Sequence, residues 1–311
     1  AAQRAGRRFF LCASALACGI MLAMRENSRV EQAVGFLLHL VDAETAERVR
    51  ARTGLPGPED PRTSRLRLTR AWTWARCLPS SVALWILEND DPALNAVMWN
   101  HLADDAGLRR AVARGVPFGA GRTGPLHVDR AVREQEPEVP DSYVRHGLVG
   151  ALRAVTSMGQ ARAAASMVLT AEDWWTVGEA DLDRPLPGYA RWALSVRPDC
   201  PPLVRAVFGS HAKFTHRLRE AGIVDGPAEY ATAHGPAVDV LEVLAMGHLL
   251  FPARVHEAQD ALRPLVRDHL GDREEAWAVL AQLMETFHGR TPELVMTAGA
   301  IAPRSTRPTA A

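Results

Sequence analysis

Apolar residues recur along this chain at helical spacing, whereas segments that alternate apolar and polar residues are nearly absent. After Pro92 the apolar positions fall at i, i+3, i+4 and i+8, and His101 completes the stripe at i+7. The stripe consists of Leu94, Val97, Met98 and Leu102. A second run follows with the same spacing, and Gly115 supplies a left-handed stop. The pattern predicts an all-α fold of short helices.

Start and stop signals extend this prediction along the chain. Residues 29–40 should be helical, and Asp42 should cap a further helix that ends at Gly54. Helical patterning returns from Ser142 to His288, where five prolines are expected to separate short elements. These are Pro185, Pro198, Pro236, Pro252 and Pro264.

The resulting organisation has five parts. We expect an N-terminal apolar helix and helical hairpin, a helical repeat region, a flexible loop or linker, a C-terminal helical repeat region and a disordered tail. Their ranges are 1–60, 61–116, 117–140, 141–301 and 302–311. Between Gly115 and Pro140 the helical period disappears and Gly, Pro and acidic residues accumulate, so this segment should bury little apolar surface and be the most mobile internal one.

The letters GAGRTG, from Gly119 to Gly124, lie in that segment and fit the GxGxxG pattern of dinucleotide-binding sites. Such a fingerprint needs a strand before it and a helix after it, and the sequence predicts neither. A plain loop is the favoured interpretation, and no cofactor is predicted.

An internal repeat carries the main architectural information. The first copy runs from Leu78 to Val116 and the second from Leu186 to Ile223, with similar residue types in the same order. If they are copies of one helical unit, three pairs of residues should be equivalent. Trp85 and Trp192 should be largely buried, Asp91 and Asp199 should lie at or near helix N-caps, and Leu94 and Leu203 should face the core.

The order Asp-Pro-x-Leu, then histidine, then Leu-Arg and glycine resembles HEAT repeats and the related leucine-rich-repeat-variant helical arrays. The resemblance is clear in the two copies and looser from Pro236 to His288. It implies an irregular α–α superhelix, a HEAT-like solenoid in which each repeat buries its apolar face against its neighbours. Family members are mostly binding scaffolds, so it implies a concave interaction surface and transfers no catalytic residue. Lys213 is the only lysine, a bias that resembles GC-rich actinobacterial proteins.

Composition excludes little beyond this. The chain has 311 residues, 47% hydrophobic and 23% charged, with a formal net charge of zero. It therefore lacks the overall attraction of a general nucleic-acid or anionic-membrane binder, although a local basic face stays possible. The cysteines have no CxxC spacing, so free buried thiols are expected at Cys12, Cys18, Cys77 and Cys200.

The N-terminal segment leaves two interpretations open. Arg7 and Arg8 precede an uncharged run over residues 9–24, which partly matches a twin-arginine export signal. The run is shorter than the ~20 residues that span a bilayer. A buried first helix in a cytoplasmic protein is the prediction, with export or membrane association through this run as the alternative.

Histidines and tryptophans are the remaining candidates for chemistry. HEAQD places His256 and Asp260 one helical turn apart, which supplies two metal ligands and no third, so no metal site is predicted. Four other histidines fall near helix C-termini and should cap them: His101, His248, His269 and His288. Most tryptophans, including Trp72, Trp74, Trp99 and Trp277, should fill space between helices. Adjacent Trp174 and Trp175 cannot both point into one core, so one of them is a candidate interaction anchor.

The sequence contains no GxSxG elbow, P-loop lysine or CxxC, so no catalytic residue is assigned and an enzyme is not predicted. The expected function is a non-enzymatic helical-repeat scaffold that binds a protein partner. The alternative is a helical-repeat enzyme or binder acting on nucleic acid, with arginines on the concave face and an acid such as Asp173 as general base. A weaker alternative is a membrane-tethered regulator anchored by residues 9–24.

Overall fold

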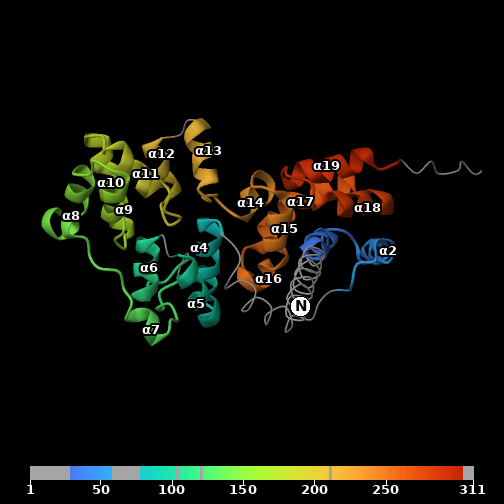
Figure 1. Ribbon diagram of the computed structural model, residues 1–311, viewed down its shortest axis with the longest axis horizontal. Helices are drawn as coiled ribbons and strands as arrows, with labels where there is room; N and C mark the ends of the chain where they lie inside the picture. Colours follow the sequence, from blue (N-terminus) through green and yellow to red (C-terminus); the bar gives the residue numbers. More distant parts are fainter. Residues whose placement is uncertain (1–28, 58–77, 103–104, 120–121, 210–211, 304–311) are drawn as a thin grey trace, which may run out of the picture. The chain divides into compact units, whose positions relative to one another are not determined.

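The computed structural model describes residues 29–57, 78–102, 105–119, 122–209 and 212–303. These ranges contain helices and their connections and no strand, so the all-α prediction is confirmed for them (Figure 1). The chain divides into two compact units. The described part of unit 1 is 29–57, 227–248 and 255–303, and that of unit 2 is 78–226 without its gaps, together with 249–254.

Several predictions concern residues outside those ranges. They include the arginine pair and the apolar run of the N-terminus, three of the four cysteines, and two tryptophans. The residues are Arg7, Arg8, 9–24, Cys12, Cys18, Cys77, Trp72 and Trp74.

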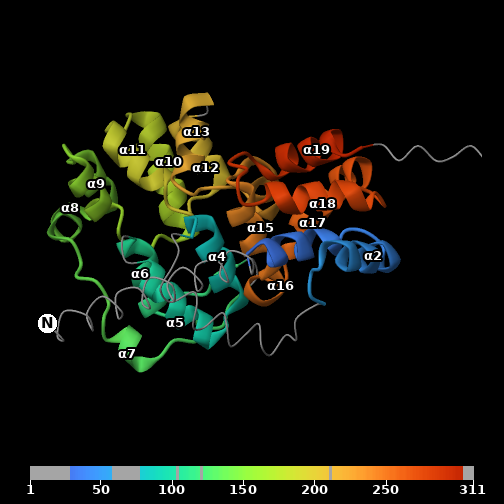
Figure 2. The same ribbon diagram turned by 45° about the vertical axis from the view of Figure 1, so that its right-hand side comes forward.

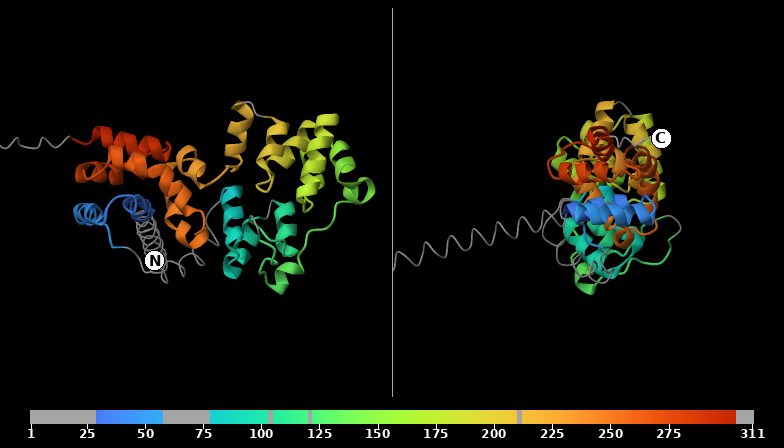
Figure 3. Two further views of the ribbon diagram at one scale, coloured as in Figure 1. Left: turned by 180° about the vertical axis from the view of Figure 1, so that it is seen from behind. Right: turned by 90° about the vertical axis from the view of Figure 1, so that its right-hand side faces the viewer.

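Unit 1 joins the N-terminal helices to the end of the chain. Beside the helical residues 29–38 it contains α2 (Ala43–Thr53), α14 (Pro227–Ala233), α15 (Ala237–Ala245), α17 (Val255–His269), α18 (Glu274–Leu283) and α19 (Thr291–Ile301). Helix α18 packs against α19 and α2, and α17 packs against α14 and α19 (Figure 3). The described residues of 1–60 therefore belong with the last helices rather than with the segment that follows them.

The predicted limits of α2 are confirmed. The Asp42 carboxylate accepts the Thr45 N–H at 2.8 Å, and Gly54 ends the helix with φ of 70°. The expectation for Pro264 is wrong, because this proline lies inside α17 instead of separating two elements. Pro264 is exposed, and a proline on the outer face of a helix leaves the missing hydrogen bond to solvent.

Unit 2 is a succession of short helices. They are α4 (Ser80–Asn89), α5 (Pro92–His101), α6 (Ala106–Ala113), α7 (Arg130–Arg133), α8 (Asp141–Arg153), α9 (Met158–Ala164), α10 (Ala171–Asp183), α11 (Gly188–Ser195), α12 (Pro202–Phe208) and α13 (Ala212–Glu220). Helix α9 lies beside α8 and α11, and α12 lies beside α10 and α11 (Figure 2). The four-residue α16 (Gly247–Leu250) lies where the chain passes between the units.

Part of the predicted repeat is present in unit 2. Each copy contains three helices: Pro79 and Pro187 precede the first of them, and Gly115 and Gly222, both with positive φ, follow the third. The residue after each glycine donates its N–H to a carbonyl five residues earlier, Val116 to Ala111 and Ile223 to Leu218, both at 2.9 Å. The two helices therefore end in the same way. Asp91 caps α5 as expected, by accepting the N–H groups of Ala93 and Leu94.

The residue-by-residue match of the two copies is wrong at Leu203 and Trp192 and holds only in part at Asp199. Asp199 lies near Pro201, the N-cap of α12, but does not cap the helix. Leu94 is 8% exposed but Leu203 is 79% exposed, and Val204 takes the core position instead. The second copy has one more residue between its aspartate and its leucine than the first copy has. Every later side chain of the second copy is therefore rotated by about 100° about the helix axis relative to its counterpart in the first.

The tryptophans of the repeat differ for a similar reason. Trp85 is the sixth residue after its N-cap and Trp192 is the fifth, and Trp85 is buried whereas Trp192 is half-buried. Each nevertheless packs edge to face against a phenylalanine, Phe251 at 5.6 Å and Phe214 at 5.9 Å between ring centroids. The prediction of equivalent buried positions is therefore wrong for Trp192.

The segment from Gly115 to Pro140 is bound to unit 2 at several points. Phe118, Leu126 and Val132 are buried, so the expectation of little apolar burial is wrong. The buried Arg110 donates to the carbonyls of Pro137 and Glu138 at 3.1 and 2.7 Å. The segment contains only the short α7, and its mobility stays a prediction.

Candidate partner-binding surface

The two adjacent tryptophans have opposite environments. Helix α10 begins with a capping box in which Thr170 and Asp173 hydrogen-bond each other's backbone N–H, at 3.1 and 2.8 Å. This start fixes the rotation of the helix. Trp174 is 3% exposed and packs in the core of unit 2, whereas Trp175 is 63% exposed. Trp175 is therefore the residue of the pair that a partner could contact, and Asp173 has a structural role as a cap.

Trp175 belongs to a larger apolar surface. Leu182 follows it by two helical turns and is 71% exposed, and on α12 the exposed Leu203 is joined by Val207 at 36%. We call Trp175, Leu182, Leu203 and Val207 the α10–α12 surface. The other exposed positions of α12 are Pro202 and Ala206, so the outer face of this helix carries no charge. Exposed apolar side chains that lie together in this way mark interaction sites more often than scattered ones do.

The contact between the two helices brings these side chains together. A Cβ placed on Gly178 would lie 3.9 Å from Cγ1 of Val204, so the helices meet at these two residues. Trp175 and Leu182 lie on the flank of α10 next to Gly178, within about 6 Å of it along the helix axis. Leu203 and Val207 lie on the flank of α12 that is turned away from the buried Phe208. Each pair therefore lies beside the residue through which its helix meets the other, Gly178 on α10 and Val204 on α12.

An acidic row follows the α10–α12 surface along one edge. Glu172 and Glu179 are exposed and, like Trp175 and Leu182, are seven residues apart. They lie beside that apolar pair on the surface of α10, further from Gly178. Within the described ranges neither carboxylate has an ion-pair partner. The other acids of this helix are engaged: Asp181 pairs with Arg191 at 2.8 Å and Asp183 with Arg153 at 3.7 Å.

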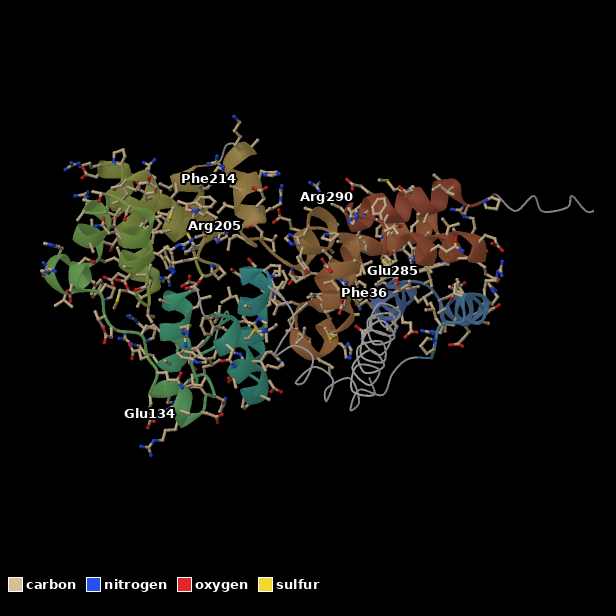
Figure 4. The ribbon with its side chains drawn as sticks, viewed as in Figure 1. Phe36, Glu134, Arg205, Phe214, Glu285 and Arg290 are labelled. Atoms are coloured by element: carbon tan, nitrogen blue, oxygen red, sulfur yellow. The ribbon has the colours of Figure 1, made fainter. Side chains whose placement is uncertain are left out.

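Buried arginines hold the helices beneath this surface. Arg205 of α12, labelled in Figure 4, donates to the carbonyls of Ser195, Arg197 and Cys200 at 3.0 to 3.1 Å, and these hydrogen bonds tie α12 to the end of α11. Arg197 binds the Met167 carbonyl at 2.7 Å and also the carbonyl of Ala165. A Cβ on Gly107 would lie 2.7 Å from the Arg197 guanidinium, so a side chain at this position would displace the guanidinium from its partners. These contacts make the surface a preformed one.

The buried ionisable groups nearby do not form a reactive centre. Burial raises the pKa of the Cys200 thiol to about 12, so the thiolate needed for nucleophilic chemistry is scarce at neutral pH. The one cysteine that the structure describes is free and buried, as expected. Burial also raises the pKa of Asp105, although Arg197 opposes this shift. Asp105 caps α6 by accepting the Leu108 N–H at 2.9 Å.

The histidine candidates are dispersed. His256 and Asp260 lie exposed on α17, and no cluster of three potential metal ligands occurs among the residues described. The Nδ1 atom of His248 lies 3.1 Å from the Ala245 carbonyl, in keeping with the predicted C-terminal capping role. Among the described contacts the imidazoles of His269 and His288 form no capping hydrogen bond, and the capping role of His101 stays a prediction.

The GAGRTG letters fall outside any nucleotide-binding context. Neither a strand nor a helix adjoins the described part of this segment. Arg122 lies 3.5 Å from the Asp90 carboxylate, which also accepts the His127 N–H at 2.9 Å. The segment is therefore fastened to the end of α4.

The sequence could have revealed part of this surface but not all of it. The seven-residue spacing of Trp175 with Leu182, and of Glu172 with Glu179, is visible in the chain. The repeat pattern misses Leu203 and Val207, because it places Leu203 in the core. Among the described helices, none has the length and apolar character to cross a membrane. No family model, curated protein or solved structure matches this chain.

Proposed function

We propose that this chain is a non-enzymatic HEAT-like helical-repeat scaffold that binds a protein partner through the α10–α12 surface. The exposed indole of Trp175, with three apolar side chains around it, is the observation that carries the proposal. Tryptophan is enriched among the residues that dominate binding energy, and an indole loses little conformational entropy when a partner covers it. The buried arginines below it reduce the cost of ordering the surface on binding.

The solenoid part of the proposal has support in unit 2. Short helices follow one another with prolines at their starts, and helices next but one in sequence, such as α10 and α12, lie side by side. Glycine stops recur at Gly115 and Gly222. The offsets in the second copy are compatible with an irregular array, in which repeats vary in length.

The arginine side chains are largely engaged within the protein, which favours a protein partner over nucleic acid. Arg110, Arg197 and Arg205 are buried and donate to main-chain carbonyls. Many exposed arginines pair with acids, as in Arg114 with Glu136 at 2.8 Å and Arg130 with Glu134 at 2.7 Å. Nucleic-acid binding depends on cations that are available for phosphates, and the edge of the α10–α12 surface is acidic.

Site-specific photo-crosslinking in the native host would test this proposal. A photoreactive phenylalanine analogue would replace Leu182, Leu203 or, as a control, Val144, which is 71% exposed on α8. We expect a discrete protein adduct from the first two positions and none from Val144. Trp175→Ala introduced together with the probe should abolish the adduct. Equal labelling from all three positions, or adducts that persist without Trp175, would disprove binding through this surface.

A further inference from the structure

We infer that the partner is an amphipathic helix whose apolar stripe is bordered on one side by lysine or arginine. The inference rests on the proposed function, because it names the chemistry of the segment that would cover the α10–α12 surface. It depends on the acidic row of Glu172 and Glu179, which the proposal of an apolar binding surface does not require.

The arrangement of the two rows determines the shape of the partner. Trp175 and Leu182 are seven residues apart, which corresponds to about 10 Å along α10. Leu203 and Val207 form a shorter apolar row on the neighbouring helix α12. A third helix laid over the contact between α10 and α12 can bury both rows with side chains at i, i+3, i+4 and i+7. An extended strand has no sheet edge to pair with in the described part of unit 2.

The charges beside the α10–α12 surface determine which residues the edge of that helix should carry and on which side they should lie. Glu172 and Glu179 border the surface on the α10 side, and the exposed residues of α12 offer no charge on the other side. The two carboxylates repel an acidic partner and attract a basic one, so a helix with cations on the matching edge is favoured. The formal net charge of the whole chain is zero, so such a preference cannot arise from general attraction.

Three synthetic helical peptides with one shared leucine stripe would serve as the probe. Their edge positions would all be lysine, all glutamine or all glutamate, and binding to the full chain would be measured by fluorescence anisotropy. We expect the lysine peptide to bind about tenfold more tightly than the glutamate peptide at low salt, with the glutamine peptide between them. The difference should shrink as the ionic strength rises.

Variants separate the charge inference from the proposed function. The double variant Glu172→Lys with Glu179→Lys should reverse the order of the three peptides. Glu285→Lys, a change at an exposed position of unit 1, should leave the order unchanged. Trp175→Ala should weaken all three peptides, and circular dichroism would confirm that each variant is folded.

Each result has a distinct meaning. Equal binding of the three peptides that still depends on Trp175 would overturn the basic-helix inference and leave the proposed function standing. Binding that is insensitive to Trp175→Ala, or no binding, would overturn both. Sedimentation showing a dimer that Leu203→Ser dissociates would identify a second copy of the chain as the occupant and would also overturn the inference.

Discussion

Arg197 and Asp199 form a bidentate ion pair across a single intervening residue. Nε and Nη2 of the guanidinium lie 2.9 and 2.6 Å from the two carboxylate oxygens, and the arginine side chain is almost wholly buried. The remaining nitrogen donates to the Met167 carbonyl in the connection before α10. The pair therefore joins the turn between α11 and α12 to the connection between α9 and α10.

Removal of this guanidinium should destabilise unit 2 strongly. Arg197→Ala leaves the Asp199 carboxylate and two carbonyls without their donor, and we expect a loss of about 3 to 5 kcal/mol in urea unfolding. Arg197→Lys should restore little, because an ammonium cannot bind both carboxylate oxygens and the carbonyls together. Arg162→Ala, at an exposed position of α9, is the matched control and should change stability by less than about 0.5 kcal/mol. Similar unfolding midpoints for the two alanine variants would contradict this account.

The rotation of α12 can be tested by two neighbouring substitutions. Val204 is buried, so Val204→Ala should cost about 1 to 3 kcal/mol of unfolding free energy. Leu203→Ala should cost less than about 0.5 kcal/mol, since its side chain is exposed. Thermal unfolding of both variants gives the comparison. The alignment of the two copies from the sequence places Leu203 in the core and therefore predicts that Leu203→Ala is the more destabilising change. A larger loss of stability for Leu203→Ala than for Val204→Ala would support that alignment and contradict the observed rotation of α12.

In this chain, capping residues at helix ends predict the structure better than the similarity between the two repeat copies does. Asp42, Gly54 and Asp91 are placed correctly from the sequence because a cap depends only on the residues within one turn. The role of Asp199 is not predictable in this way, since its partner Arg197 competes with the backbone N–H groups that a cap would bind. The exposure of one residue of the pair Trp174 and Trp175 follows from helix geometry alone.

The rest of the candidate site requires knowledge of which helices are neighbours. Leu203 and Val207 acquire significance only because α12 packs beside α10 at Gly178, and no local pattern encodes that contact. The anchoring of the segment after Gly115 depends in the same way on Arg110, whose partners lie 27 and 28 residues further along the chain.

Cys200 should be inert in the folded protein. Burial raises the pKa of its thiol to about 12, so the thiolate fraction at pH 8 is very small and the sulfur is shielded from reagents. We expect iodoacetamide at pH 8 to label the peptide that contains Cys200 only after urea unfolding, as measured by mass spectrometry of the digested protein. Peptide mapping distinguishes it from the other three cysteines. Rapid labelling under native conditions would refute the buried position.

Asp90 should stabilise the fold at neutral pH and lose this effect in acid. Burial by itself raises its pKa, but hydrogen bonds from the His127 N–H and imidazole and from Asn95 outweigh that effect and lower the pKa. A carboxylate whose pKa is lowered by folding contributes fully above the unfolded value of about 3.9, and the contribution is lost as pH falls through the folded-state pKa. Asp90→Asn should cost about 1 to 2 kcal/mol at pH 7 in urea unfolding. The cost should shrink below about pH 4, and a cost that stayed constant with pH would rule out this assignment.

Asp105 should behave in the opposite way. Burial raises its pKa, and neither the nearby Arg197 nor the Leu108 N–H compensates fully. A carboxyl whose pKa is raised by folding contributes most stability below the unfolded value of about 3.9, and that contribution is lost as pH rises through the folded-state pKa. Asp105→Asn removes the buried charge and keeps an oxygen that can cap α6. This variant should therefore unfold at higher urea than the parent at pH 7, and the two should converge as pH falls below about 4. A destabilised variant at pH 7 would show that the charge of Asp105 supports Arg197 more than burial penalises it.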